Sequence, residues 1–585
     1  MQFDQPEGLP DDKIAWVSDV AAQMLRRFKF PYISLCPGAS YRGLHDSLVN
    51  HLGNQMPSMI VCLHEDHSVA IAHGYAKATG EPMACVLHAN IGLLHGMMAL
   101  YNAWCDRVPM FVLGATGPMD SSERRPWIDW IHTSADQGGL IRDFIKWDNQ
   151  PTSAEAMIEA MCRANIVTRT EPTAPVYICL DAGLQESSLE NVPEFPDVSR
   201  FQAPPPPRVT AASLAKAVEL LRSAKRPLIM IGRGDLTIES WNARVKLAER
   251  LGACVMTDLR HHAAFPTDHP AHVVAPFGHR KMDHAARAIV AEADVVLSLE
   301  WWDIGTTTND EPDSPATKAK VISATLDPAL HNGAHMNYMR LGPVDVPITA
   351  SADSLVVDLL EALGPGHREP WRAKAAPKKY VETTKPTMAS IAKELHDAVE
   401  DPDLVSISVL CRAWPSDIFP FHNPLAYLGR DGGGGLGSGP GIAVGAALGL
   451  PDRLNVAIVG DGDFCMGGSA VWSAAHSRIP VLIIVNNNRS YFNDEMHQDA
   501  IARRRNRPAS NRWIGQRMAD PEVDICKLAE SKGAVGLGPI KSNDELRKAM
   551  AKGIAVIKSG GVCVIDVHIE PGEERAAAAM TPRNT

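Results

Sequence analysis

Two polar clusters each follow a short apolar run. The segment GDGDF (460–464) closes the run 456–459, and VNNN (485–488) closes the run 481–484. In open parallel sheets, ligands bind at the carboxyl ends of the strands, so these residues could meet at one ligand. Glycines let the backbone approach a phosphate, and a helix N-terminus offers free N–H groups. The pattern predicts a phosphate-binding edge, with GDG as a turn that leads into a helix over 468–476.

The acidic side chain of Asp461 would repel a bare phosphate, so a cation is expected between them. Mg²⁺ prefers oxygen ligands and commonly bridges protein carboxylates to phosphate oxygens. One carboxylate, one amide oxygen from the asparagine run, one backbone carbonyl and a diphosphate would nearly complete its coordination. The alternative is that GDG is a plain turn and NNN a polar loop.

The composition is typical of a globular protein of several domains. The chain has 585 residues, of which 45% are hydrophobic and 21% charged, and this length predicts about three or four domains. The formal charge of −11 argues against a nucleic-acid partner. No secretory signal and no apolar stretch of about 20 residues is visible, so we expect a cytoplasmic protein without membrane spans.

Two connecting segments divide the chain into three blocks. APPPPR (203–208) reads as a stiff polyproline connection, and 364–387 is rich in proline and lysine. In each block, short β-rich runs alternate with helical patterns, which is typical of parallel α/β sheets. We therefore predict an α/β protein of three doubly wound parallel-sheet domains, at 10–190, 208–363 and 388–571, with a flexible tail at 572–585. The expected strands are 32–35, 59–63, 83–87, 110–113 and 176–180 in the first block; 227–231, 253–257, 295–299 and 321–324 in the second; 404–409, 456–459, 481–485 and 562–567 in the third.

A resemblance to a known family rests on several segments. GDG with an asparagine 27 positions after its aspartate resembles the thiamin-diphosphate motif. GGGGLGSGPGIAVGAALGL (432–450) resembles the turn and helix before that motif, and LHEDHSVAIAHGYAKATGEP (63–82) resembles the segment with the coenzyme-activating glutamate. The match continues in LHANIGLLHGMMALYNAWCDRVPMFVLGATGP (87–118) and FPTDHP (265–270). The resemblance covers nearly the whole chain and is to the pyruvate oxidase and decarboxylase group, which includes acetohydroxyacid synthases. Within it, VLHANIG (86–92) most resembles the benzoylformate decarboxylases.

The resemblance implies thiamin diphosphate and Mg²⁺ as cofactors. It also names the three blocks as pyrimidine-binding, middle and diphosphate-binding domains. The implied metal ligands are the side chains of Asp461 and Asn488 and the carbonyl of Ser490. The residues implied to contact the coenzyme are Glu65, Gly434, Leu436, Asp461, Gly462, Asp463, Asn488 and Ser490, with Leu436 supporting its bent shape.

Glu65 and His88 are the implied catalytic residues. Glu65 follows an apolar run and precedes an apolar helix face, and desolvation there favours the protonated carboxyl. It could then share a proton with the pyrimidine ring of the coenzyme. His88 lies 23 positions later at a predicted strand end, and an imidazole suits proton transfer near neutral pH. A surface carboxylate and a structural histidine are the plainer interpretations.

The substrate pocket is expected to differ from that of a benzoylformate decarboxylase. Ala39 stands where those enzymes have serine, and His95 where they have asparagine. Asn493 and His497 offer polar groups where the relatives are apolar. Trp301 could wall the pocket or pack in the core. These differences favour a more polar 2-oxo acid, or a 2-hydroxy ketone or acyl compound.

The leading hypothesis is a lyase that removes CO₂ from a 2-oxo acid without oxidation, with carboligation as a further outcome. Alternatives within the fold are an acetohydroxyacid-synthase-like carboligase and a 2-hydroxyacyl-CoA lyase, for which RRRNR (503–507) could receive the coenzyme A. A nicotinamide-dependent dehydrogenase is the alternative from another class, and GRGDLT (232–237) is a poor loop for a flavin phosphate. Because Glu65 and Asp461 lie in different blocks, the resemblance implies a homodimer or homotetramer with active sites between subunits.

Overall fold

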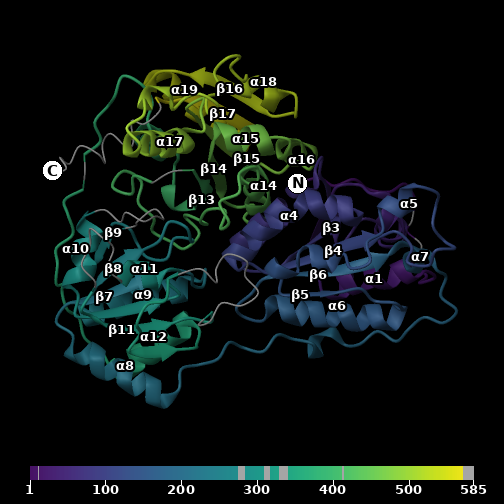
Figure 1. Ribbon diagram of the computed structural model, residues 1–585, viewed down its shortest axis with the longest axis horizontal. Helices are drawn as coiled ribbons and strands as arrows, with labels where there is room; N and C mark the ends of the chain where they lie inside the picture. Colours follow the sequence, from purple (N-terminus) through teal and green to yellow (C-terminus); the bar gives the residue numbers. More distant parts are fainter. Residues whose placement is uncertain are drawn as a thin grey trace.

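The computed structural model describes residues 1–570 apart from 9, 11, 275–283, 309–316, 328–339, 378 and 412–413. Within these residues, the strands form three sheets that occupy three lobes (Figure 1). Every strand pairing between named strands is parallel. The predicted fold class, three parallel-sheet α/β domains, is confirmed. The expected tail at 572–585 lies outside the described residues.

The first sheet has the order β2-β1-β3-β4-β6-β5. Its strands are β1 (Tyr32–Leu35), β2 (Ser58–Val61), β3 (Met83–Leu87), β4 (Met110–Thr116), β5 (Trp147–Asn149) and β6 (Pro175–Asp181). The helices of this lobe are α1 (Val17–Arg27), α2 (Arg42–Asp46), α3 (Glu65–Thr79), α4 (Ala89–Asp106), α5 (Ile128–Ile131), α6 (Ala154–Arg169) and α7 (Ala182–Glu186).

The middle sheet has the order β12-β11-β10-β7-β8-β9. Its strands are β7 (Pro227–Ile231), β8 (Cys254–Thr257), β9 (His272–Val274), β10 (Val295–Leu299), β11 (Lys320–Ala324) and β12 (Val346–Ile348). Its helices are α8 (Ala211–Ser223), α9 (Ile238–Leu251), α10 (His284–Glu292), α11 (Ile304–Thr308) and α12 (Ala352–Leu363).

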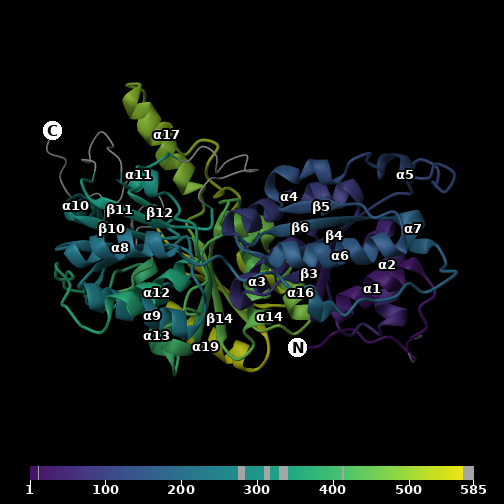
Figure 2. The same cartoon turned by 90° about the horizontal axis from the view of Figure 1, so that it is seen from below.

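The third sheet has the order β13-β14-β15-β17-β16. Its strands are β13 (Val405–Leu410), β14 (Leu454–Gly460), β15 (Val481–Asn487), β16 (Val535–Ile540) and β17 (Val562–His568). Its helices are α13 (Met388–Ala398), α14 (Gly439–Gly449), α15 (Asp461–Gly467), α16 (Ala470–His476), α17 (Phe492–Arg504), α18 (Ile525–Glu530) and α19 (Asn543–Lys558). Helix α17 stands away from the three lobes (Figure 2).

The predicted turn at GDG is wrong, because the helix begins earlier than expected. Strand β14 ends at Gly460, and Asp461 is already the first residue of α15. Asp461 and Asp463 lie in the first helical turn, where a negative charge favours a helix N-terminus. A second helix, α16, covers most of the range in which the sequence placed the first.

The first and third lobes pack through helices α3 and α14. A Cβ on Gly445 of α14 would lie 1.9 Å from the Ile71 carbonyl oxygen, and one on Gly74 of α3 would lie 2.0 Å from the Ile442 carbonyl oxygen. Only glycine allows the two backbones to approach so closely. The helices thus join both lobes into one buried apolar cluster, which includes Val69 and Ile442. Within the described residues, no helix combines the length and apolar character needed to cross a bilayer.

Candidate functional site

Asp461 and Asn488 converge on one backbone N–H group. The N–H of Ser490 donates to Asp461 Oδ2 at 3.1 Å and to Asn488 Oδ1 at 3.0 Å. The two oxygens meet because β14 and β15 pair in parallel, with Gly460 beside Asn486. The predicted metal ligands are therefore brought together at the carboxyl edge of the third sheet.

The charge of Asp461 fits a site built for a cation. Burial raises the pKa of Asp461 to about 6, although backbone N–H groups such as that of Ser490 oppose the shift. A buried carboxylate beside an amide oxygen is a donor set that a hard divalent cation prefers. The residues at this edge thus fit Mg²⁺, with the Ser490 carbonyl as a further candidate ligand.

Asp463 contacts the glycine-rich turn rather than facing Asp461. Its Oδ1 accepts the N–H of Gly437 at 2.6 Å and that of Gly439 at 3.4 Å. A Cβ on Gly439 would lie 2.2 Å from Asp463 Oδ2, so the turn and the carboxylate are in tight contact. The side chain of Asp463 therefore holds this turn in place.

The turn holds Gly434 and Leu436 beside α4. Gly434 has φ +68°, and no described atom outside its chain neighbours lies within 4 Å of the position that a Cβ would take, so a ligand could approach its backbone. Asn102 of α4 donates from Nδ2 to the Gly435 carbonyl oxygen at 3.1 Å. Leu436 is 44% exposed, which leaves its side chain available for contact with a ligand or a second subunit.

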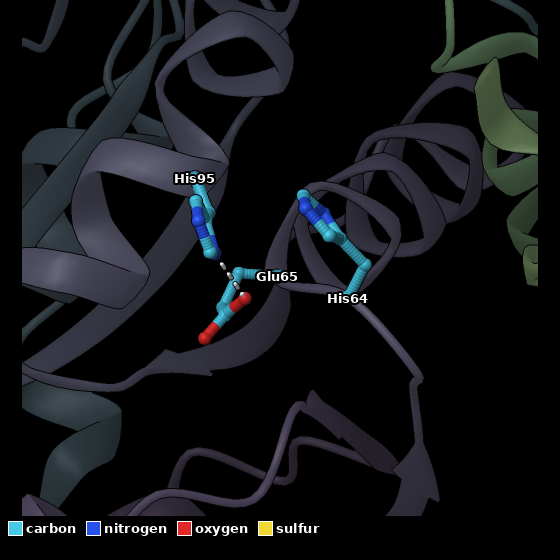
Figure 3. A group of neighbouring side chains, drawn as sticks. All are labelled: His64, Glu65 and His95. Atoms are coloured by element: carbon cyan, nitrogen blue, oxygen red, sulfur yellow. Dashed lines mark hydrogen bonds and ion pairs between the residues drawn. The ribbon is translucent and has the colours of Figure 1, made fainter.

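Glu65 is the first residue of α3 and is buried. Helix α3 begins here because His64 caps it, with Nδ1 accepting the Asp66 N–H at 3.1 Å. Glu65 Oε2 lies 3.1 Å from Nδ1 of His95, which reaches it from α4 (Figure 3). The rings of His64 and His95 stack with centroids 4.8 Å apart. His95, expected in the substrate pocket, thus contacts the carboxyl group of Glu65.

His88 lies between β3 and α4, close to Glu65. A Cβ on Gly92 would lie 3.0 Å from both Glu65 Oε1 and His88 Cβ, so the first turn of α4 brings the two predicted catalytic residues together. Burial lowers the pKa of His88, with a further contribution from His132. This environment favours the neutral imidazole.

Two residues beside His88 were missed in the sequence. Ser40 Oγ lies 2.9 Å from His88 Nδ1, and the ring of His132 meets that of His88 edge-on at 4.9 Å. Ser40 directly follows Ala39, which is itself exposed. No local pattern links Ser40 or His132 to His88, because each contact joins distant segments.

The remaining predicted pocket residues lie elsewhere. Asn493 and His497 are exposed on α17, the helix that stands clear of the lobes in Figure 2. Trp301 is buried in the middle lobe, where its Nε1 donates to Thr307 Oγ1 at 3.0 Å. Trp301 thus packs in the core, which is one of the two placements that the sequence left open.

A cavity of about 390 Å³ lies between the middle sheet and the end of α3. It is lined by Gly234 and Asp235 of the segment proposed as a poor flavin loop, and Asp235 N–H is already bound by Asp353. Burial and nearby carboxylates raise the pKa of Glu171 and Asp235. This acidic lining offers little to a diphosphate, because its lysine and arginine side chains are already paired with carboxylates: Lys77 with Asp106, Arg107 with Asp327, Arg233 with Glu300 and Arg260 with Asp258.

Comparison with known proteins finds family models that match three parts of the chain. Models of thiamine pyrophosphate enzymes match the N-terminal TPP binding domain at residues 15–140, the central domain at 214–361 and the C-terminal TPP binding domain at 410–567.

Relatives with assigned names match over most of their length. The chain is 25% identical to a probable acetolactate synthase large subunit of Methanocaldococcus jannaschii, covering 95% of this chain and 90% of the relative. It is 26% identical to a benzoylformate decarboxylase of Pseudomonas aeruginosa, covering 88% and 92%. The crystal structure of benzoylformate decarboxylase from Polynucleobacter necessarius has the same fold, with a TM-score of 0.79 at 19% identity over 95% of this chain and 99% of that one. The chain belongs to the thiamin-diphosphate-dependent enzymes, in the group that contains the pyruvate oxidases and decarboxylases.

Proposed function

We propose that this protein is a lyase that decarboxylates a 2-oxo acid without oxidation, with thiamin diphosphate and Mg²⁺ as cofactors. The observation that carries the proposal is the meeting of buried Glu65 and partly exposed His88 at Gly92. This arrangement offers a carboxyl group and an imidazole at one edge of the first sheet. The relative named benzoylformate decarboxylase supports a reaction of this class.

The proposed coenzyme site combines the edge of the third sheet with the glycine-rich turn. Asp461, Asn488 and the Ser490 carbonyl would hold Mg²⁺, and the backbone of Gly462 and Asp463 would bind the diphosphate at the N-terminus of α15. Gly434 and Leu436 would contact the ring system. When bound, the coenzyme supplies the carbanion and the electron sink for cleavage next to a carbonyl.

We propose separate tasks for the two oxygens of Glu65. Oε2 is engaged by His95, so Oε1 is the atom left to exchange a proton with the coenzyme. His88, the residue before α4, lies near Glu65 and would face the oxygen atoms of a 2-oxo acid. Ala39, near His88 in the chain segment that holds Ser40, would border the substrate.

A carboligase is the second candidate, because several relatives are named acetolactate synthase. The same residues would serve it, and the difference would lie in whether a second substrate enters before the product is protonated. The exposed arginines at 503–507 could also meet a 2-hydroxyacyl-CoA thioester, although a solvated basic surface explains them equally well.

We also propose at least a dimer with active sites between subunits. An apolar patch, defined as Leu94, Met98, Leu436 and Met466, runs from α4 across the glycine-rich turn to α15 and is exposed. It is continuous because Met98 contacts Gly435 and Met466 lies against Gly437. Exposed apolar surface of this kind marks an interface. A second copy would cover it and could bring Asn493 and His497 near a substrate.

Activity on a panel of 2-oxo acids tests the function. The full-length protein, loaded with thiamin diphosphate and Mg²⁺, is expected to release CO₂ and an aldehyde from at least one of them. Glu65→Gln should abolish this release, whereas Glu190→Gln, at an exposed position, should leave it unchanged. Formation of a 2-hydroxy ketone or cleavage of a hydroxyacyl-CoA without CO₂ release would favour the second candidates. A protein that neither binds the coenzyme nor turns over any of these compounds would refute the proposal.

A further inference from the structure

We propose that Ser40 positions His88 as a neutral imidazole with its proton on Nε2, so that His88 acts as a hydrogen-bond donor to an oxygen of the substrate. The proposed role at the substrate rests on the proposed function, whereas the state of His88 follows from the contacts of this chain alone. Ser40 is a positioning residue, because it acts through His88.

Three contacts connect Ser40 with His88 and Ala89. The N–H of Ala89 donates to Ser40 Oγ at 3.0 Å, so this oxygen already accepts a hydrogen bond. Ser40 Oγ lies 2.9 Å and Ser40 N 3.5 Å from His88 Nδ1. A backbone N–H can only donate, so this contact favours Nδ1 as the acceptor. A proton on Nδ1 would face the Ser40 N–H directly.

The backbone around Ser40 is held in place from a second element. Gln185 of α7 donates from Nε2 to the Ser40 carbonyl oxygen at 3.0 Å, and Ser40 is buried. The alignment of Oγ and N with His88 therefore depends on the fold of the lobe. This rigidity is what a group that sets a histidine tautomer requires.

The covered edge of the His88 ring is the edge that bears Nδ1. A Cβ on Gly38 would lie 2.5 Å from His88 Cβ and Cγ and 2.6 Å from Nδ1, so the Gly38 backbone closes this side. His88 as a whole is partly exposed, whereas Ser40 and His132 are buried. The Nε2 edge is thus the one left to meet a substrate.

The charged and titratable neighbours favour the neutral ring. Burial lowers the pKa of His88 most, His132 after α5 and Arg125 lower it further, and Glu65 of α3 opposes them. A neutral imidazole with Nε2–H donates a hydrogen bond to a carbonyl or carboxylate oxygen without giving up its proton. Such a donor stabilises the negative charge that grows on that oxygen.

Replacement of Ser40 tests the proposal through two readouts. In Ser40→Ala, kcat on a 2-oxo acid substrate should fall by about tenfold or more with little change in KM, and Ser40→Thr should restore most of it because the hydroxyl returns. Ser187→Ala is the matched control, since Ser187 is an exposed serine of the same lobe whose hydroxyl donates to Gly183. An unchanged kcat in Ser40→Ala would overturn the role of Ser40.

The second readout needs no substrate. Exchange of the His88 Cε1 hydrogen for deuterium, followed by peptide mass spectrometry across pH, gives the pKa of this residue in the full-length protein. We expect a midpoint below the ordinary value of about 6.5 and a rise in Ser40→Ala, because a hydroxyl that donates to Nδ1 stabilises the neutral ring. A midpoint at or above the ordinary value in the unmodified protein would overturn the neutral state of His88.

The two proposals fail in different ways. If no 2-oxo acid is turned over, the proposed function fails, and the exchange experiment still decides the state of His88. If turnover is observed but the midpoint does not move in Ser40→Ala, the proposed function stands and the role of Ser40 is refuted. Should Ser40→Ala not fold, Ser40→Cys keeps the size with a weaker donor and allows the same comparison.

Discussion

Asp461 and Asp463 lie two residues apart in the first turn of α15, yet they contact different partners. Their replacement should therefore have opposite effects on the stability of the protein. Asp461 is buried beside Asn488, whereas Asp463 accepts two backbone N–H groups of the glycine-rich turn. Asp461→Asn should weaken Mg²⁺-dependent binding of the coenzyme at least about tenfold while leaving the stability of the coenzyme-free protein unchanged or higher, because a desolvated charge is removed. Calorimetric titration and thermal unfolding measure both effects.

Asp463→Ala is the contrasting change at the same scale. It leaves two buried N–H groups of the turn without a partner, which costs about 2 kcal/mol of unfolding free energy. The coenzyme-free protein should therefore unfold at a lower temperature than the unmodified protein. Equal loss of stability in Asp461→Asn and Asp463→Ala would contradict the separate roles of the two carboxylates.

Residues at strand ends could be predicted from the sequence, whereas the residues that contact them from distant parts of the chain could not. Asp461, Asn488, Glu65 and His88 each follow an apolar run, so their positions at strand ends could be inferred from the sequence. Asp461 and Asn488 lie at the edge of the third sheet, and Glu65 and His88 lie at the edge of the first. Ser40 reaches His88 across 48 positions, and its partner could not be read from spacing. The roles of the predicted residues in binding stay predictions, while the position of each in the fold is now known.

At the scale of elements, the close contact of α3 and α14 gives a further prediction. An alanine in a helix is usually more favourable than glycine by about 1 kcal/mol. Gly445→Ala should instead destabilise the protein by about 3 kcal/mol, because the new Cβ would overlap the Ile71 carbonyl oxygen and the helices must move apart. Gly553→Ala in α19 is the control, since its Cβ would meet only side-chain ends such as Ile565 Cδ1 at 3.1 Å. A gain of stability in Gly445→Ala, measured by thermal unfolding, would contradict this packing.

The long buried strands were predicted from the sequence, and the short edge strands were missed. β5, β9 and β12 have three residues each, which is too few for an apolar pattern. β16 is also an edge strand, and it contains Gly538 and Pro539. Glycine and proline are rare inside strands, so no strand pattern is visible in the sequence there. The start of α15 was also missed, because glycine and aspartate are common to turns and to helix N-termini. Pairing with a neighbouring strand and packing of the helix decided these segments.

At the scale of the whole molecule, Asp106 joins the first lobe to the third. Its carboxylate pairs with Lys77 and His73, and a Cβ on Gly432 would lie 2.4 Å from its Oδ1. Although burial favours the neutral acid, Lys77 and His73 outweigh it and lower the pKa of Asp106 to about 2. The lowered pKa means that this ionised group stabilises the fold above the ordinary aspartate value of about 4, and that the contribution is lost as the pH falls toward 2.

Asp106→Asn should therefore reveal this link between the lobes. It would leave Lys77 buried without its carboxylate, at a cost of about 3–5 kcal/mol near neutral pH. Between pH 5 and 8, the unfolding temperature of the variant should lie well below that of the unmodified protein. Below pH 4, the difference between the two unfolding temperatures should shrink. A difference that stays constant into the acidic range would show that the charge of Asp106 is not its source.

The proposed dimer leads to a prediction about mixed assemblies. If Glu65 of one subunit serves the coenzyme held by Asp461 of the other, Glu65→Gln and Asp461→Ala are each inactive alone but complement one another. A mixed dimer then has one site with both changes and one site with neither. Denatured and refolded together in equal amounts, the two variants should regain about a quarter of the unmodified activity, because half of the dimers are mixed and each holds one intact site. If both residues serve the same site within one subunit, no mixed dimer has an intact site and the mixture stays inactive, which would refute the shared site whatever the size of the assembly.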